Sequence, residues 1–387
     1  MRLLHTSDWH LGRRLHGADL LADQAVFLEW LLDVAQSENA DAVLVSGDVY
    51  DRAQPGADAI GLLDRTVAAF ARARIPLIVS SGNHDSAVRL QYAGEVLADA
   101  GIHLRTALNQ VTDPIVLSEP TGARLGVYAI PYLLPDAVVG ELDVDRSHAA
   151  VLAALVERIR SDATRRDLER VVVMAHAFVT GGSACESERE IRVGGVGDTP
   201  AGVFDGVSYV ALGHLHGPQE VHLAGSATVV EYCGSPLAFS FSERDHTKSV
   251  TVVDIDAAGT VGTRRIPTPI PRPLVQVRGR LEDLLEGAQG DLASLADAWV
   301  KVVLTDPGRL ANPMEQLRTA WPHTLVLEFA PERADPELGL TRVSEASDPS
   351  EICAEFVATV SGAPPTSSQR GVLTEVVLAA QRVEVLS

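Results

Sequence analysis

Cysteine, lysine and long apolar runs are scarce in this 387-residue chain. Its three cysteines, Cys185, Cys233 and Cys353, lie far apart and form no C-x-x-C pair. This spacing argues against a disulfide framework or a zinc–thiolate site and fits a reducing cytoplasm. No run of about 18 or more apolar residues occurs, so we expect no transmembrane helix. A polar motif already begins at Asp8, where a cleavable leader would lie, so we also expect no signal peptide.

Positive charge is also in short supply. The chain has 32 Lys+Arg against 52 Asp+Glu, a formal net charge of −20 and a pI near 4.9. An acidic surface favours solubility and repels nucleic acid, because nucleic-acid binding depends on neutralising phosphates. Lys248 and Lys301 are the only lysines. The other basic residues are arginines. Arginine suits bidentate phosphate contacts, but a genome rich in G and C also favours arginine over lysine. With 46% hydrophobic residues, the chain is expected to be globular, with two or three domains.

The first part of the chain alternates short apolar strands with helical patterns, which predicts a layered α/β domain over residues 1–266. The expected strands lie at residues 3–4, 42–46, 76–80, 171–175, 207–212, 219–223, 228–232 and 249–255. The expected helices lie at residues 24–36, 57–72 and 86–100 and around 151–159. Strands follow one another late in this domain, which predicts a mixed sheet or a second sheet packed on the first.

The rest of the chain is expected to form a linker and two small units. Alternating prolines predict a stiff linker over residues 267–273. Strand patterns at 274–278, 299–304 and 324–329 then predict a small α/β cap domain over residues 274–335. In the last unit, residues 336–387, Asp348-Pro349-Ser350-Glu351 has the form of a helix start.

Two short helices in that last unit carry apolar stripes that they cannot bury alone. The stripes are Ile352, Phe356, Val357 and Val360, and Leu373, Val376, Val377 and Ala380. The two helices therefore either pack back on the body of the protein or dock on another protein.

Five polar motifs each follow directly after an expected apolar strand. They are Asp8-Trp9-His10, Gly47-Asp48-Val49-Tyr50-Asp51, Gly82-Asn83-His84-Asp85, His176 and Gly213-His214-Leu215-His216. The carboxyl ends of parallel strands meet at one edge of a sheet, so we expect all five motifs to converge there. Alternation in an extended segment would point Asp8 and His10, and likewise His214 and His216, to the same side. The glycine that precedes Asp48, Asn83 and His214 leaves room for a sharp turn.

The residue types in these motifs predict a two-metal phosphoesterase. Asp, Asn and His without cysteine suit divalent cations such as manganese, iron or zinc. Seven such side chains are more than one cation needs. Two cations about 3.5–4 Å apart that share a carboxylate form the usual clamp for in-line attack on phosphorus. Each motif alone is a weak signal: the Gly82–Asp85 segment, for instance, could be a turn in which Asp85 caps the next helix. Their joint order and placement carry the prediction.

The order D-x-H, G-D-x-x-D, G-N-H-D, H, G-H-x-H resembles that of the calcineurin-like metallophosphoesterases. The likeness extends to the bacterial SbcD family, the nuclease subunits of SbcCD complexes. The segments that carry it are Thr6-Ser7-Asp8-Trp9-His10-Leu11-Gly12, Gly47-Asp48-Val49-Tyr50-Asp51, Gly82-Asn83-His84-Asp85-Ser86 and Tyr232-Cys233-Gly234-Ser235-Pro236. This resemblance covers the whole chain and implies an αββα sandwich with a small α/β cap domain and a C-terminal helical hairpin.

The resemblance also implies roles for individual residues. The first metal would be bound by Asp8, His10 and His216. The second would be bound by Asn83, His176 and His214, with Asp48 as the bridge. His84 matches the family's non-ligand histidine and would orient the phosphate or protonate the leaving oxygen. Asp51 stands where archaeal and eukaryotic relatives carry a histidine, and its role stays open. Four nearby arginines could contact DNA phosphates or be solvated loop residues: Arg13, Arg14, Arg52 and Arg89.

The function that the resemblance implies is a manganese-dependent DNA nuclease of DNA repair, recombination and replication. It would act as a 3′→5′ exonuclease and endonuclease on double-strand ends and hairpins. An SbcC-like coiled-coil ATPase would dock on the C-terminal helices, and the chain would form a homodimer within a heterotetramer, in the cytoplasm and on the nucleoid. The acidic charge favours an alternative, a small-molecule phosphodiesterase for substrates such as cyclic nucleotides. A third alternative is a non-catalytic scaffold for DNA ends, yet none of the seven ligand positions is replaced.

Overall fold

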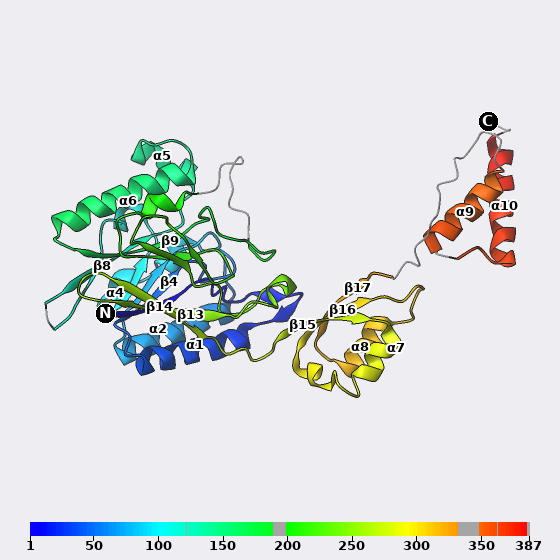
Figure 1. The fold of residues 1–387 in the computed structure, drawn as a ribbon, viewed down its shortest axis with the longest axis horizontal. Helices are drawn as coiled ribbons and strands as arrows, with labels where there is room; N and C mark the ends of the chain where they lie inside the picture. The colour runs from blue at the N-terminus through cyan, green and yellow to red at the C-terminus, as the bar shows by residue number, and fades with distance from the viewer. Residues whose placement is uncertain (121, 189–198, 332–347, 362, 385–387) are drawn as a thin grey trace. The chain divides into compact units, whose positions relative to one another are not determined.

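A computed structural model describes residues 1–120, 122–188, 199–331, 348–361 and 363–384 (Figure 1). The chain divides into two compact units, residues 1–273 and residues 274–387. None of the helices within the described ranges is long and apolar enough to cross a membrane.

The first unit contains two six-stranded sheets. One has the strand order β14-β13-β1-β4-β5-β6, in which β1 (Arg2–Thr6), β4 (Ala42–Ser46), β5 (Leu77–Ser80) and β6 (Ile102–Arg105) are parallel. In this sheet β13 (Ser249–Ile255) is antiparallel to β1 and to β14 (Val261–Pro267). The other has the order β11-β12-β10-β9-β8-β7, with parallel central strands β12 (Val229–Tyr232), β10 (Tyr209–Gly213), β9 (Arg170–His176) and β8 (Arg124–Ile130). Its antiparallel edges are β11 (Gln219–Val221) and β7 (Ile115–Ser118).

Helices cover the outer face of each sheet, so the layers are helix, sheet, sheet, helix. The apolar sides of α1 (Leu21–Ser37) and α2 (Ala57–Ala73) pack on the first sheet, and those of α5 (Pro135–Leu142) and α6 (His148–Arg165) on the second (Figure 1). Between the sheets lies a third apolar layer that includes Leu44, Met174 and Ala211, all fully buried. The predicted αββα sandwich is confirmed.

Several sequence predictions in this unit need correction. The helix expected over residues 86–100 is two short helices, α3 (Ala87–Leu90) and α4 (Gly94–Ala98). The break lies at Ala93, whose φ of +58° is incompatible with a continuous right-handed helix. Strands β6, β7, β8 and β14 and helix α5 were not predicted, nor was the short hairpin of β2 (Arg14–Leu15) and β3 (Ala18–Asp19). In the case of β14 the reason is exposure, because most of its residues face solvent and no apolar pattern marks it.

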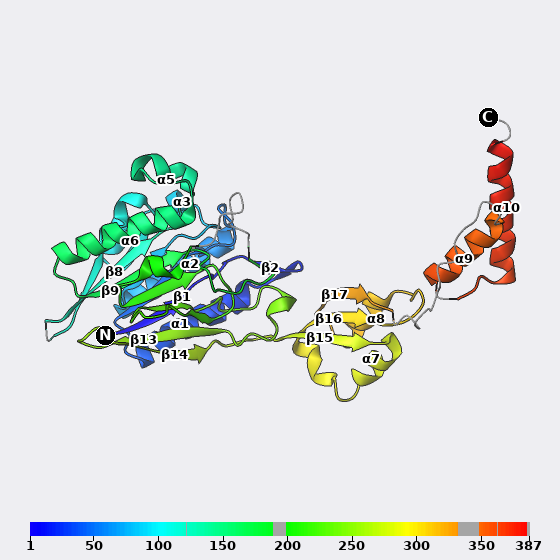
Figure 2. The ribbon, with the colours of Figure 1, turned by 45° about the horizontal axis from the view of Figure 1, so that its top comes forward.

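The second unit begins with a parallel three-stranded sheet of β15 (Leu274–Gly279), β16 (Trp299–Leu304) and β17 (Thr324–Phe329), which Figure 2 shows side by side. Helices α7 (Leu281–Gly287) and α8 (Pro313–Ala320) enclose a small core with it, around the buried Trp321. The boundary predicted at residue 335 lies outside the described residues.

The chain ends in two helices, α9 (Pro349–Ser361) and α10 (Ser367–Glu384), which pack against each other. The predicted helix start is confirmed, because Asp348 Oδ1 accepts a hydrogen bond from the backbone N–H of Ser350 at 2.9 Å. Four short 3-10 turns complete the described structure: Leu108–Gln110, Ala201–Phe204, Phe241–Glu243 and Ala293–Asp297.

Candidate metal centre

All seven predicted ligand side chains lie where strands of the two sheets end. Asp8 and His10 follow β1, Asp48 follows β4 and Asn83 follows β5 in the first sheet; His176 ends β9, and His214 and His216 follow β10 in the second. Because these five strands run parallel within their sheets, their carboxyl ends meet at a common edge. The sheets approach closely there, since His176 Nε2 lies 3.5 Å from Asp48 Oδ2.

The side chains form one buried cluster. Two sets made up only of predicted ligands have ligand atoms within 4.8 Å of one another and could hold a cation: Asp8 with His10 and His216, and Asp8 with Asp48 and His176. Two further sets, His10 with Asp48 and His84, and Cys185 with Glu188 and His216, include other residues. His10 Nε2 lies 3.2 Å from His216 Nε2, and His176 Nε2 lies 2.9 Å from Asn83 Oδ1. All of the seven except Asn83 are buried. Imidazole nitrogens and carboxylate and amide oxygens gathered at these distances suit divalent cations.

The backbone of the motifs differs from the extended form that the sequence predicted. Asp8 and His10 have φ values of +52° and +44°, and His214 has a φ of +101°. Alternation along an extended segment is therefore the wrong reason for their convergence. The loop after β1 is instead held against the loop after β4, because Asp8 N donates to Gly47 O at 3.0 Å and His10 N donates to Asp48 O at 2.9 Å. These hydrogen bonds hold the left-handed backbone of Asp8 and His10 in place.

Glycine is required in three of the motifs because neighbouring atoms of the site occupy the space of a Cβ atom. A Cβ on Gly82 would lie 2.2 Å from Asp48 Oδ1. A Cβ on Gly47 would lie 2.4 Å from His176 Nδ1, and Gly47 also has a φ of +84°. A Cβ on Gly213 would lie 1.8 Å from Ser46 O and 2.9 Å from His176 Nδ1. At all three positions the absence of a side chain allows this close approach.

Burial gives the cluster the electrostatics of a cation site. Burial raises the pKa of Asp8 to about 6, although His176 and His216 oppose this shift. Burial and then the neighbouring imidazoles lower the pKa of His10 and of His214 well below the usual value for histidine. His10 Nδ1 and Asn83 Nδ2 are buried and find no hydrogen-bond partner among the described residues. Neutral imidazoles have lone pairs that can bind a cation. A buried carboxylate is costly to ionise without a positive charge beside it, and a bound cation would supply that charge.

Asp85 joins two of the motifs. Its carboxylate accepts hydrogen bonds from the backbone N–H groups of Gly82 at 2.9 Å, Val49 at 3.1 Å and Tyr50 at 2.9 Å. The loop after β5 is thereby fixed to the loop after β4. The suggestion that Asp85 caps the next helix is wrong, because all of its described bonds go to these loops.

Several residues near the cluster were not found from the sequence. Ser187 Oγ lies 2.7 Å from His216 Nδ1, and Glu188 Oε1 accepts a hydrogen bond from His216 N at 2.6 Å. Glu243 and Lys248 form a buried ion pair behind the same histidine. Burial opposes ionisation of Glu243, but hydrogen bonding toward His216 and the charge of Lys248 lower its pKa well below the usual range. No motif spacing marks these residues, and the one available signal is that Lys248 is one of two lysines in the chain.

The four arginines predicted near the site differ in their environment. Arg13 donates to Asp51 Oδ1 at 3.0 Å and to Ser187 O at 2.9 Å, and its side chain is 17% exposed. Arg89 donates to Ala53 O at 2.6 Å. Arg14 and Arg52 have side chains 62% and 74% exposed. Arg13 therefore belongs to the framework of the site, and the other three arginines lie at the surface.

Comparison with known proteins identifies the family. A model described as calcineurin-like phosphoesterase matches residues 1–218, and one described as type 5 capsule protein repressor C-terminal domain matches residues 270–361. The chain is 31% identical over 332 residues to the D subunit of the nuclease SbcCD from Staphylococcus epidermidis, covering 84% of this chain and 85% of that protein.

Solved structures resemble the chain only loosely. A dimetal phosphatase from Danio rerio is 11% identical, covering 70% of this chain and 99% of its own, with a TM-score of 0.42. The protein TT1561 of Thermus thermophilus is 13% identical, covering 68% of this chain and 98% of its own, with a TM-score of 0.39.

The family model covers more than half of the chain, and the similarity to the SbcCD nuclease covers 84% of it, more than the first unit alone. The predicted phosphodiesterase activity and its dependence on divalent metal are properties of that family. The chain therefore belongs to the calcineurin-like phosphoesterases and, among them, to the SbcD family of nuclease subunits.

Proposed function

We propose that the chain is the nuclease subunit of a DNA-processing complex, with 3′→5′ exonuclease and endonuclease activity on double-strand ends and hairpins. The observation that carries the proposal is the cluster of Asp, Asn and His side chains in a chain related over most of its length to a nuclease subunit. Such an enzyme serves DNA repair, recombination and replication, and works in the cytoplasm on the nucleoid.

The ligands of two divalent cations would come from the two sheets. Asp8, His10 and His216 would hold the first cation. Asn83, His176 and His214 would hold the second. Asp48 would bridge them, and its position supports this role: Asp48 Oδ2 lies 3.7 Å from His10 Nε2 on one side and 3.5 Å from His176 Nε2 on the other. Once bound, the cations supply Lewis acidity, which activates a water molecule and neutralises charge on the phosphate.

His84 is the proposed catalytic histidine. Its Nδ1 lies 2.8 Å from the carbonyl oxygen of Asp51, and because a carbonyl accepts only, Nδ1 must carry the proton. This bond fixes the ring so that Nε2 faces the cluster, 3.9 Å from Asp48 Oδ2. When the ring is doubly protonated, Nε2 also carries a hydrogen, and from there it can orient a phosphate oxygen or give that proton to the leaving oxygen. The contact also gives Asp51 a supporting role through its backbone, while its carboxylate holds Arg13.

Manganese is the proposed physiological metal. The ligand set mixes imidazole nitrogen with carboxylate and amide oxygen, which suits borderline cations, and none of the proposed ligands is a cysteine. Phosphate contacts are proposed for Arg14, Arg52 and Arg89, with Arg13 supporting the site from beneath. The net charge of −20 implies weak and strongly salt-dependent DNA binding by the chain alone.

An activity assay tests the proposal directly. The purified chain with manganese is compared on blunt duplex DNA, on a DNA hairpin and on cyclic nucleotides, with and without the coiled-coil ATPase. We expect nucleotide release from duplex ends and hairpin cleavage, and we expect EDTA to stop both. Hydrolysis of cyclic nucleotides without release from DNA would replace the proposal with the small-molecule phosphodiesterase.

Metal removal should destabilise the protein most at neutral pH. The pKa of Asp8 rises from 3.8 to about 6 on burial, so its contribution to stability is full at low pH and is lost as pH rises through about 6. In EDTA at about pH 7.5, we therefore expect Asp8→Asn to melt at a higher temperature than wild type, with a smaller difference at about pH 4.

Saturating manganese should reverse this order. A site filled at about 100 times its Kd gains about 2.7 kcal/mol. This corresponds to a rise in Tm of roughly 5–10 °C in a domain of this size. Only wild type should show the full rise, because Asp8→Asn lacks one of the proposed ligands. Thermal melts at the two pH values check both statements. An Asp8→Asn protein that melts below wild type in EDTA at neutral pH would contradict them.

The helices α9 and α10 are the proposed docking site for an SbcC-like coiled-coil ATPase. Their exposed apolar side chains include Phe356 at 66%, Val360 at 70% and Val376 at 60%. An apolar face of this kind on a helix pair suits helix-in-groove binding to a coiled coil.

Deleting residues 348–387 should leave nuclease activity on simple DNA substrates and end copurification with the ATPase. Phe356→Asp should weaken the same binding, whereas Ser368→Asp, at an exposed polar position on α10, serves as its matched control. Pull-down of the ATPase with each variant measures this. If the truncated chain still captures the ATPase, the proposed docking site is wrong.

A second group of exposed apolar side chains supports a homodimer within a heterotetramer. Val88 on α3, Tyr92 between α3 and α4, and Val96 on α4 are 83%, 83% and 73% exposed. Apolar side chains exposed together at this level are typical of an interface between proteins. The molar mass of the free chain in solution, from light scattering, should correspond to two copies, and the mass of a monomer would contradict this assignment.

A further inference from the structure

A buried carboxylate lies behind His216, on the side of the ring away from the cluster. The Glu243 side chain is 0% exposed, and its Oε1 lies 3.5 Å from His216 Nδ1. The same oxygen accepts hydrogen bonds from Ser187 Oγ at 2.5 Å and from Phe239 N at 3.1 Å. Ser187 Oγ lies 2.7 Å from His216 Nδ1. The other ring nitrogen, His216 Nε2, lies 3.2 Å from His10 Nε2 inside the cluster.

A buried ammonium balances this carboxylate. The Lys248 side chain is also 0% exposed, and its Nζ donates to Glu243 Oε2, to Ser235 Oγ at 3.0 Å and to the carbonyl oxygen of His216 at 2.9 Å. A buried ion pair adds little stability by itself, because desolvation offsets the attraction between the charges. Its contacts with both the ring and the backbone of one proposed ligand point to a role at that ligand.

The directions of these hydrogen bonds determine where His216 carries its proton. A carboxylate accepts only, and a hydroxyl has one hydrogen to give. Ser187 gives that hydrogen to Glu243, so its oxygen must accept one from His216 Nδ1. His216 Nε2 is then left with a lone pair that faces the cluster. This is the tautomer that metal binding through Nε2 requires.

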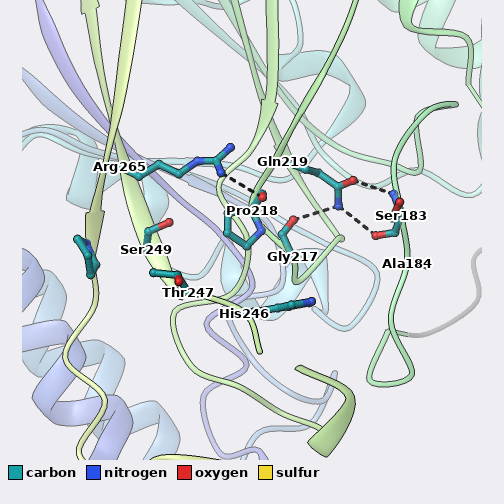
Figure 3. A pocket seen from close by; sticks show the side chains of 10 residues that line it. Ser183, Ala184, Gly217, Pro218, Gln219, His246, Thr247, Ser249 and Arg265 are labelled. Carbon is teal, nitrogen blue, oxygen red and sulfur yellow. Dashed lines mark hydrogen bonds between the residues drawn. The ribbon is translucent and has the colours of Figure 1, made fainter. Parts of the chain in front are cut away.

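Side-chain hydrogen bonds also hold the backbone from His216 to Pro218. Three successive carbonyl oxygens accept side-chain hydrogen bonds: His216 O from Lys248, Gly217 O from Gln219 at 3.0 Å and Pro218 O from Arg265 at 3.2 Å. Figure 3 shows the last two of these bonds across a pocket beside the turn. Gln219 also exchanges two hydrogen bonds with Ser183, at 2.7 and 3.0 Å, in the loop that leads to Ser187. The loop and the turn therefore hold each other in place.

We propose that Glu243 is a positioning residue for the first metal site, acting through Ser187 on the ring of His216 and through Lys248 on its backbone. It fixes the tautomer and orientation of His216, and so sets the affinity of that site. This inference rests on the proposed ligand role of His216. Partners of this kind, which hold the outer nitrogen of a ligating histidine, typically change metal affinity by about 10- to 100-fold.

Manganese binding to the full chain tests the inference. Free Mn²⁺ is measured by electron paramagnetic resonance during titration of wild type, Glu243→Gln, Ser187→Ala and the double variant. We expect two sites in wild type, one of which weakens by about 10- to 100-fold in Glu243→Gln and by a smaller factor in Ser187→Ala. The double variant should lose no more than Glu243→Gln, because both residues act through one chain of hydrogen bonds.

A matched control removes a buried carboxylate elsewhere. Asp162 on α6 is 4% exposed and bonds to Tyr128 and Arg166. Asp162→Asn should lower Tm and leave both manganese affinities as in wild type. Circular dichroism shows whether Glu243→Gln folds. If it does not fold, the manganese affinity of Ser187→Ala tests the inference, because Ser187 lies in a loop where the substitution should not prevent folding.

Two different failures are distinguishable. Two manganese sites of wild-type affinity in both Ser187→Ala and Glu243→Gln would overturn the positioning role and leave the proposed function intact. Fewer than two sites in wild type would instead contradict the proposed metal centre itself.

Discussion

Asp48→Asn should remove manganese from the protein and lower hydrolysis of duplex DNA by roughly 10³-fold or more. Asp48 is 2% exposed, and its Oδ2 lies between His10 on one side and His176 on the other. An amide at this position loses the negative charge and one of the two equivalent oxygen atoms that a bridge between cations needs. A metal stabilises the transition state by several kcal/mol, and each 1.4 kcal/mol or so is tenfold in rate.

The measurement combines metal content by mass spectrometry with rates on blunt duplex DNA. Asp33→Asn is the control, because Asp33 is an exposed carboxylate on α1. It should keep both the metal content and the rate of wild type. Wild-type manganese content in Asp48→Asn would show that this carboxylate does not bridge the cations.

His84→Ala should abolish detectable hydrolysis while leaving the metal content near that of wild type. The ring is held by the carbonyl of Asp51 through Nδ1, and its Nε2 faces the cluster. Loss of a group that orients or protonates the reacting phosphate typically costs about 10²- to 10⁴-fold in rate. Rates and metal content are measured together, with the exposed His222→Ala as the control.

Loss of metal in His84→Ala would have a definite meaning. His84 forms a set with His10 and Asp48 whose ligand atoms lie within 4.8 Å of one another, so its geometry is also compatible with metal binding. If His84→Ala loses its metals together with its activity, His84 is a ligand and the proposed proton transfer is wrong.

Much of the catalytic unit could be predicted from its sequence, because local patterns determine the elements concerned. β4 lies at Ala42–Ser46, where an apolar run predicted it, and α2 at Ala57–Ala73 is within one residue of its prediction. The motifs could be assigned to one edge because each follows a buried parallel strand. The order of the strands within the two sheets could not be read in the same way, since it depends on pairings between segments far apart in the chain.

The surroundings of the candidate site were less accessible from the sequence for the same reason. Ser187 and Glu243 approach His216 from positions 29 and 27 residues away along the chain, and neither belongs to a repeated spacing. The left-handed backbone at Asp8 and His10 likewise depends on hydrogen bonds to the loop after β4. Tertiary contacts of this kind leave no periodic signal in the sequence.

The central claim is that seven side chains at one sheet edge hold two divalent cations. Crystals of the manganese-loaded chain, measured near the manganese absorption edge, test it most directly. We predict two anomalous peaks about 3.5–4 Å apart, both next to Asp48, with one beside His10 and His216 and the other beside Asn83 and His176. A single peak, or two peaks outside this cluster in a protein that cleaves DNA at the full rate, would contradict the account.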